Sequence, residues 1–498
     1  MDVVYERIGQ AGPQQRKYAA LISCGNGLAA FQMVYLVFAG AEMTASCIDN
    51  DGKSKQDNVC KLWSLGACRE LRITPVPTSH LDTITKEWSL VCDDAYKISF
   101  AQSVYMCGVL VGSLIFGVVS DTIAFSYFSF ITFRFLAGVG IAGHGIVSFV
   151  LCSELVGGSK RSSIGIVIMA VFALGICVMV PVAWLFPFWR HFTHVLTLIS
   201  LIVFSFYLIL PESPCWLASQ GQMVKCRQIL LKIARGNGLT IQESAIAELT
   251  ASHADKKTGK DRPSPGPTDN SGGLRAVFQH WLLFKWTAIQ MFSWFCNSAV
   301  YYGLTMAAGG LSSNLFKSVF LSGIVELPAY ILILLFINRT GRRTLLCSTM
   351  VVGGLACMCI RLVGPDPSVA YMRTSLALIG KMGIAASFCI IYIHSSEIFP
   401  TVMRNSALGI CSMSARIGGV LAPFIILLGK SHPTDEFVAF GLLSLTAGLL
   451  NLLLPETRNK PLPETVPDLW AIFKESNPPA KVSLPVEHTS SHAKLLHD

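Results

Sequence analysis

The chain has 498 residues, of which 52% are hydrophobic and only 14% are charged. A soluble protein carries about 25% charged residues, so this composition excludes an ordinary soluble domain and indicates a polytopic membrane protein. We attribute the net charge of +9 to loops of unequal charge across a membrane, because no basic tract is interleaved with aromatic residues as nucleic-acid binding would require.

Eleven apolar segments are long enough to cross a membrane as helices, the conformation that satisfies backbone groups in lipid. Arg16 and Lys17 precede the first of them and favour a cytoplasmic N-terminus. The expected spans are 18–41, 97–119, 123–151, 163–186, 192–210, 283–305, 315–337, 344–363, 374–394, 404–428 and 437–454.

Polar segments divide these spans into two helical halves. A basic central region, 211–282, is expected in the cytoplasm because Lys and Arg gather in cytoplasmic loops. The expected organisation is a cytoplasmic N-terminus (1–17), an N-terminal half (18–210) with an extracellular loop (42–96), the central cytoplasmic loop (211–282), a C-terminal half (283–455) and a cytoplasmic tail (456–498).

The extracellular loop holds four of the sixteen cysteines of the chain. Because the outer side of a cell is oxidising, we expect two disulfides there, and three connectivities remain open. The four candidates are Cys47, Cys60, Cys68 and Cys92.

The two halves repeat the same charged residues. Glu397 and Arg404 each lie 243 residues after Glu154 and Arg161, and Pro455-Glu456 repeats Pro211-Glu212 at an offset of 244. A duplicated helical unit with its site between the halves is typical of secondary transporters.

The first half is shorter than the second. From the turn at Asn338 to Glu397 there are 59 residues, but from Asp121 to Glu154 there are 33. The difference of about 26 residues equals one membrane helix with its turn. We therefore expect an all-α fold of two six-helix halves that lacks the third helix, with the break just after Asp121.

Several long motifs occur in order between about Tyr18 and Trp470, among them PESPCWL, WFCNSAVYYGL, ELPAYILILLFINRTGRR, YIHSSEIFPTVMRNSALG and LLLPETRNKPLPET. They resemble the signatures of solute carrier family 22, a branch of the major facilitator superfamily, and most of all its carnitine and zwitterion transporters. The resemblance implies the major facilitator fold and alternating-access transport. The chain departs from the family pattern at Asp121, where the basic turn stops, at Asn338, which replaces an Asp, and at Cys215, which replaces an Arg.

Two charged residues are expected near the middle of the membrane. Arg416 and Glu326 each lie twelve residues from a cytoplasmic helix end, or about 18 Å at the rise of an α-helix. Such charges usually mark a substrate pathway. Arg416 would bind a carboxylate, and Glu326 a cationic group or a coupled ion. In the alternative interpretation the two pair with each other and hold the bundle together. By the resemblance, anion and zwitterion transporters carry Arg at the Arg416 position, whereas cation transporters carry Asp.

Aromatic and basic residues complete the expected binding site. Trp294, Tyr301 and Tyr392 suit a quaternary ammonium group through cation–π attraction, the alternative being ordinary helix packing. Lys381 is either a second contact for an anion or a lysine that reaches toward the membrane surface.

A further set of charges is expected to form cytoplasmic gates, as salt bridges that exist in one state and break in another. The alternative is a static pattern of charges at helix ends. The expected gate residues are Glu154, Arg161, Arg134, Glu397, Arg404 and Arg342.

These features predict a multi-pass plasma-membrane protein with both termini in the cytoplasm, which transports small zwitterionic or anionic organic solutes such as carnitine. Its expected partners are the organic ion, the lipid bilayer and a coupling ion, Na+ or H+, with no cofactor, metal or nucleic acid. We do not expect an enzyme, because H-E-x-x-H, G-x-S-x-G and Walker A motifs are absent. The alternatives are a short variant or membrane interaction protein that does not transport, and an organic cation or sugar-type facilitator.

Overall fold

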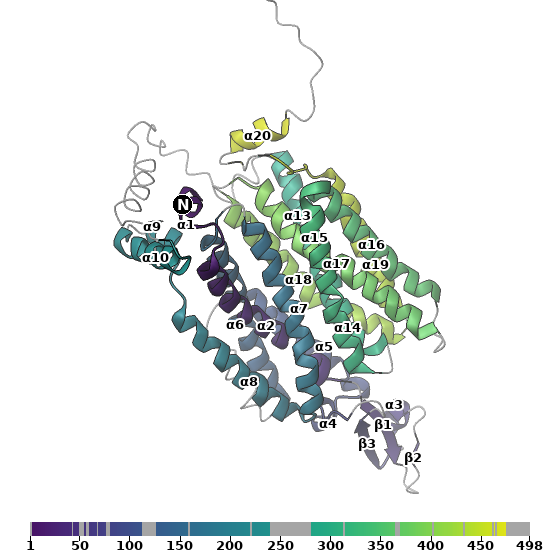
Figure 1. Ribbon diagram of the computed structural model, residues 1–498. Coiled ribbons are helices and arrows are strands. Elements are labelled where there is room, and N and C mark those ends of the chain that lie inside the picture. The colour runs from purple at the N-terminus through teal and green to yellow at the C-terminus, as the bar shows by residue number, and fades with distance from the viewer. Residues whose placement is uncertain are drawn as a thin grey trace, which may run out of the picture.

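The computed structural model describes residues 2–41, 43–48, 54–55, 59–66, 68–75, 80–111, 126–157, 160–219, 222–239, 280–311, 314–363, 369–400, 403–431, 434–460, 463 and 466–474. Long helices run side by side and form one bundle (Figure 1). Eight helical stretches in this part of the chain are long and apolar enough to cross a membrane. The fold is therefore the expected all-α polytopic bundle, while the exact number of spans stays a prediction.

Each expected span overlaps a helix in the described residues, and residues 112–125 lie outside them. The helices of the first half are α2 (Pro13–Ala39), α5 (Tyr96–Val111), α6 (Tyr127–Glu154), α7 (Arg161–Leu185) and α8 (Trp189–Phe206). Those of the second half are α13 (Trp281–Leu311), α14 (Leu315–Ile324), α15 (Glu326–Thr340), α16 (Arg342–Val363), α17 (Ala370–Ile398), α18 (Arg404–Ser431) and α19 (Asp435–Leu450).

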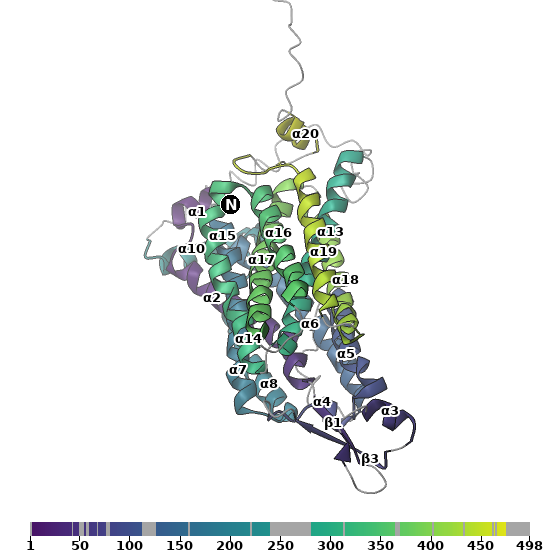
Figure 2. The same ribbon diagram turned by 90° about the vertical axis from the view of Figure 1, so that its right-hand side faces the viewer.

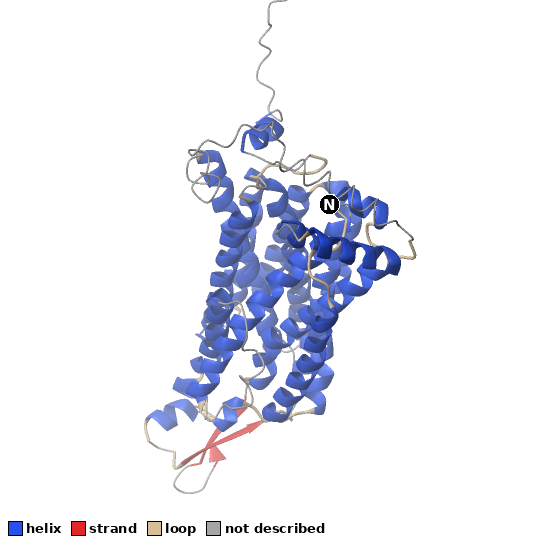
Figure 3. Cartoon of the chain, turned by 90° about the vertical axis from the view of Figure 1, so that its left-hand side faces the viewer, coloured by secondary structure: helices blue, strands red, loops and turns tan. Residues whose placement is uncertain are grey.

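The two ends of the bundle differ. One end, called here the sheet end, carries the strands β1 (Met43–Ile48), β2 (Ser54–Lys55) and β3 (Glu70–Pro75) with the short helices α3 (Val59–Ser64) and α4 (Ile84–Glu87), as Figures 2 and 3 show. The opposite end, called the N-terminal end, carries α1 (Asp2–Ile8), α9 (Pro214–Ser219), α10 (Met223–Gly236) and α20 (Val466–Lys474).

The loop at the sheet end is a small disulfide-linked unit. Strand β1 pairs antiparallel with both β2 and β3. Disulfides join Cys47 to Cys68 and Cys60 to Cys92, so both expected disulfides are confirmed and one of the three connectivities is selected. The loop is fixed to the first half because Glu87 accepts hydrogen bonds from Trp189 and Arg190 at the start of α8.

The internal repeat is visible in how helices pack. Helix α2 packs against α7, and α13 packs against α18 in the same way. The halves meet where α5 packs against α18 and where α7 packs against α14 and α15. Within the second half, α16 packs against α17 and α19, and no first-half helix in the described residues takes the corresponding place against α6 and α8.

Helices α5 and α6 run in the same direction. The Tyr127 hydroxyl donates to the Lys97 carbonyl at 2.7 Å, and further along both helices the Arg134 guanidinium lies 4.4 Å from the Tyr105 ring. Consecutive helices of an up-and-down bundle alternate in direction, so a parallel pair is what the loss of one intervening helix produces. The break expected after Asp121 itself lies outside the described residues.

Candidate functional site

The most buried charged pair in the described residues joins Glu326 to Lys381. The Lys381 ammonium lies 3.2 Å from Glu326 Oε1, and the two side chains are 0% and 2% exposed. The Tyr301 hydroxyl bonds to both carboxylate oxygens, at 2.9 and 3.1 Å, and the Tyr330 hydroxyl donates to Oε2 at 2.9 Å. Glu326 therefore pairs with Lys381 and not with Arg416, the partner considered from the sequence.

Glu326 owes its position to a break in the span expected over 315–337. Pro328 lacks an N–H, and its ring clashes with the carbonyl four residues earlier, that of Ile324, where α14 ends. Helix α15 begins at Glu326. The carboxylate thus lies at a helix N-terminus, where the helix dipole favours an anion.

The Lys381 ammonium makes three contacts with residues of α13. Its ammonium lies 3.2 Å from the centroid of the Tyr301 ring and 3.3 Å from the Tyr301 carbonyl oxygen, and it donates to the Thr305 hydroxyl. With 2% of its side chain exposed, Lys381 does not reach toward the membrane surface. The structure therefore argues against the lysine that reaches the surface, while a role of Lys381 as a contact for an anion stays a prediction.

Arg416 lies in α18, next to the aromatic side chains of Tyr302 and Tyr392. It is partly exposed, and no carboxylate of the described residues forms an ion pair with it within 4.0 Å. The Tyr302 hydroxyl beside it also donates to the Met33 sulfur of the first half, at 3.1 Å. Arg416 is thus a cation inside the bundle that retains donors for an added carboxylate.

The expected aromatic residues do come together. The ring centroids of Trp294 and Tyr392 are 4.3 Å apart, and Phe388 lies 5.7 Å from Tyr301 and 5.9 Å from Tyr392. The Tyr301 and Tyr302 rings meet edge to face at 5.3 Å. This row connects the surroundings of the Glu326–Lys381 pair with those of Arg416.

At the N-terminal end, the repeated residues make repeated contacts. Ser213, which follows Pro211-Glu212, donates to the Glu154 carboxylate at 2.5 Å. Thr457, which follows Pro455-Glu456, donates to the Glu397 carboxylate at 2.5 Å. The sequence repeat therefore encodes one structural motif twice, in which a hydroxyl binds the glutamate at the end of a long helix.

The expected gate charges are only partly brought together. Glu397 forms an ion pair with Arg342 at 3.1 Å, whereas the Arg404 guanidinium donates to the Phe399 carbonyl. Arg161 begins α7, but its side chain lies outside the described residues. The gating role of these residues stays a prediction.

Arg134 was expected among the gate charges, but it does not lie at the N-terminal end. It lies twenty residues before Glu154 in the same helix, or about 30 Å away. Its guanidinium is fully buried between the Tyr35 and Tyr105 rings and donates to the side chain and the carbonyl of Gln32. Helix α6 runs from the sheet end to the N-terminal end, and this direction places Arg134 on the opposite side from the one expected.

Contacts between the halves gather at the sheet end and at mid-depth. Phe38 stacks on Phe316 with centroids 5.7 Å apart, and Ser103 donates to the Val420 carbonyl at 2.9 Å. A side chain on Gly323, seven residues after Phe316 in α14, would meet Ile176 and Cys177 of α7. The two halves are therefore packed together on the sheet side.

Known proteins resemble this chain over most of its length. Residues 96–469 match the family model described as "Sugar (and other) transporter". A Xenopus laevis protein named "Solute carrier family 22 member 15-like" is 34% identical over 497 residues, covering 94% of this chain and 96% of the relative. A Drosophila melanogaster protein named "Organic cation transporter protein" is 36% identical over 413 residues, covering 78% of this chain and 74% of the relative.

This chain belongs to solute carrier family 22 of the major facilitator superfamily. Solved structures agree on the fold of this family 22 protein. The inward-open xylose transporter XylE from E. coli aligns with a TM-score of 0.63 at 15% identity, covering 92% of this chain and 100% of that one. The protein is thus a multi-pass membrane transporter of the secondary type and not an enzyme.

The relatives also bear on the missing helix. The alignment with the Drosophila protein runs over 413 residues but takes in 78% of the 498 residues of this chain. About 25 positions of the alignment are therefore filled by the relative and left empty by this chain. That is about the length of one membrane helix. This difference agrees with the expected loss of a helix from this family 22 protein.

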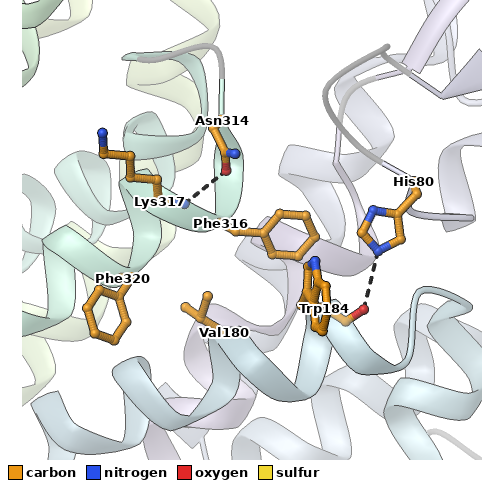
Figure 4. A pocket seen from close by; sticks show the side chains of 7 residues that line it. All are labelled: His80, Val180, Trp184, Asn314, Phe316, Lys317 and Phe320. Carbon is orange, nitrogen blue, oxygen red and sulfur yellow. Dashed lines mark hydrogen bonds between the residues drawn. The ribbon is translucent and has the colours of Figure 1, made fainter.

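A cavity of about 360 Å³ lies where the halves meet at the sheet end. Figure 4 shows Phe316 and Phe320 of α14 facing Val180 and Trp184 of α7, with His80 from the disulfide-linked loop beside Phe316. The His80 ring stacks on Phe316 at 5.6 Å. Nothing in the sequence indicates these residues, because the position of a histidine in a loop does not show which helix it will contact.

Proposed function

We propose that this family 22 protein transports small organic solutes that carry a carboxylate, either zwitterions such as carnitine or organic anions. Arg416 is the observation that carries the proposal. It lies in the middle of α18, partly exposed and without a carboxylate of the described residues within 4.0 Å. A planar guanidinium in that position suits two parallel hydrogen bonds to a carboxylate.

The local charge supports the same substrate class. Glu326 and Lys381 neutralise each other at 3.2 Å, so Arg416 leaves this region with a net positive charge. A substrate that is only a cation would meet repulsion in surroundings of low dielectric constant. Cations remain the competing class, since a relative is named "Organic cation transporter protein".

We further propose that the protein works in the plasma membrane with the sheet end outside and both termini in the cytoplasm. The two disulfides at the sheet end suit an oxidising compartment. Helix α10, at the N-terminal end, carries Lys225, Arg227, Lys232 and Arg235, and basic residues gather on the cytoplasmic side. Packing of the halves on the sheet side then corresponds to a state closed to the outside.

Transport would proceed by alternating access and draw on a gradient of Na+ or H+. Glu154, Glu397, Arg342 and the neighbouring basic residues are the proposed gate at the cytoplasmic end. Contacts such as Arg342–Glu397 at 3.1 Å lie within one half in this state. They would have to rearrange when the halves close at that end.

The proposal is tested by uptake of labelled benzoate, carnitine and tetramethylammonium into cells that display the chain. We expect saturable uptake of the two carboxylates, and a loss of about ten- to a hundredfold in Arg416→Ala, the effect of removing charge-assisted hydrogen bonds. Arg361→Ala is the matched control, because Arg361 lies near the sheet end, half exposed and 3.4 Å from Asp435. Carboxylate uptake that survives in Arg416→Ala, or transport of tetramethylammonium alone, would contradict the proposal.

A further inference from the structure

The surroundings of the Lys381 ammonium have the composition of a binding site for an alkylammonium ion. Within reach of Nζ are a carboxylate, an aromatic face and two neutral oxygens, from Glu326, Tyr301 and Thr305. Tyr330 completes the group by donating to the same carboxylate. Proteins recognise quaternary ammonium ligands through aromatic faces placed against the cation, and the Tyr301 ring has this position beside Nζ.

Stability alone does not account for this arrangement. A buried ion pair contributes little net stability, and apolar residues of similar volume serve as well or better. Glu326 and Lys381 are 0% and 2% exposed, so both have lost their contact with water. The pair also lies in the helices α15 and α17, next to the aromatic row that leads to Arg416, rather than in a part of the bundle remote from the proposed substrate.

We propose that Lys381 occupies the cation subsite of this transporter with its own ammonium group. The inference rests on the proposed function, in which Arg416 holds the substrate carboxylate. In the resting protein Glu326 and Tyr301 are already engaged by Lys381, so the site offers only Arg416 to a solute. The protein therefore prefers organic anions, and a zwitterion is accepted only by displacing Lys381 from Glu326.

The arrangement of α13 makes such a displacement direct. Tyr301 faces Lys381 and Glu326, while the next residue, Tyr302, lies beside Arg416. The two rings are 5.3 Å apart. A small zwitterion whose charges are separated by a few bonds would span these two neighbouring residues, with its carboxylate on Arg416 and its ammonium in place of Lys381.

The first experiment compares uptake by wild type, Lys381→Met and the double variant Lys381→Met/Glu326→Gln. Methionine removes the charge, and its flexible, unbranched side chain can move aside for a bound cation. We expect the ratio of carnitine to benzoate uptake to rise about tenfold or more in Lys381→Met, in line with one desolvated cation–π contact, and tetramethylammonium uptake to appear. The double variant should lose both the higher ratio and the tetramethylammonium uptake, because the site around position 381 then has no negative charge.

Lys460→Met is the matched control. Lys460 also places its ammonium over an aromatic ring, 4.6 Å from the centroid of Phe473, but at the N-terminal end and away from the site. It should leave the ratio at the wild-type value. An unchanged ratio in Lys381→Met, with benzoate uptake intact, would overturn the proposal.

A binding measurement separates this proposal from the proposed function. Tetramethylammonium should raise the melting temperature of purified Lys381→Met, and should leave wild type and the double variant unchanged. This result would support the cation subsite at Glu326 and Tyr301 even if Arg416→Ala has no effect on transport. If Lys381→Met fails to reach the membrane, recovery by tetramethylammonium in the medium supports the proposal, whereas recovery only by the added Glu326→Gln overturns it.

Discussion

Glu456 shows how a single carboxylate organises the N-terminal end of the second half. It lies after α19 and accepts hydrogen bonds from the backbone N–H groups of Arg342, Arg343 and Arg458, at 2.8, 3.1 and 3.0 Å. Two of these belong to the first turn of α16, so Glu456 caps that helix from a distant part of the chain. Burial alone would raise the pKa of Glu456, but these donors outweigh burial and hold the pKa below its ordinary value of 4.5.

The direction of this pKa shift fixes how stability depends on pH. Because the pKa is lower in the folded protein, the stabilisation is fully present above the ordinary value of 4.5 and is lost as pH falls through the folded-state pKa. We expect Glu456→Gln to lower the melting temperature of the detergent-solubilised protein at neutral pH, and the difference from wild type to shrink in acid. A difference that stays constant with pH would show that the charge of Glu456 is not what stabilises this end.

The sequence allowed the depth of single residues in the membrane to be predicted, but not which side chains they pair with. Counting helix residues placed Arg416 and Glu326 inside the bundle, where the structure has them. That Glu326 pairs with Lys381 depends on the rotation of α17 against α15, which no count along one helix supplies. Arg134 was placed at the wrong end because it lies near the start of α6, and α6 begins at the sheet end.

At the scale of elements, helices α7 and α14 approach each other closely at Gly323. A Cβ built on Gly323 would lie 2.9 Å from the Cys177 sulfur. The Cys177 thiol itself faces the Phe320 carbonyl at 3.9 Å. This contact between the halves must open if the sheet end is to open, so it reports directly on the state of the transporter.

A cysteine at Gly323 should therefore trap the state closed at the sheet end. We expect Gly323→Cys to form a disulfide with native Cys177 under mild oxidation, because their atoms lie at the required separation. Uptake should then stop, and dithiothreitol should restore it. Gly409→Cys is the control, since a side chain there meets no atom within 4 Å. Full transport by the cross-linked protein would mean that α7 and α14 do not separate during the cycle.

The elements themselves followed from the sequence with one instructive exception. Long apolar runs predicted helices, and four cysteines in one loop predicted two disulfides, both as found. The run over 315–337 was expected as a single helix, yet it divides at Val325 because Pro328 removes a backbone bond. The interruption matters for function, since it places Glu326 at a helix N-terminus.

For the whole molecule, the repeat in the sequence predicted the two halves, but not how a half that lacks a helix closes. The parallel pair α5 and α6 shows that their connection differs from that of the second half. Without a described counterpart of α16, the α6 and α8 side of the first half has fewer protein neighbours. Helix α8 is accordingly the least buried of the eight apolar stretches, at 22%.

The bundle nevertheless keeps the parts that transport requires. Helices α5 and α7, which meet the second half, are in place, and Arg416 and the Glu326–Lys381 pair lie in helices of the complete second half. We therefore expect the chain to work as a carrier without help from another protein.

The most direct test is exchange transport by the purified chain in liposomes loaded with unlabelled benzoate. We predict saturable entry of labelled benzoate that excess carnitine inhibits, that tetramethylammonium leaves unchanged, and that Arg416→Ala abolishes. No exchange by a preparation with a cooperative melting transition would contradict the account, and would mean that the carrier activity of this family belongs to a longer form of the chain.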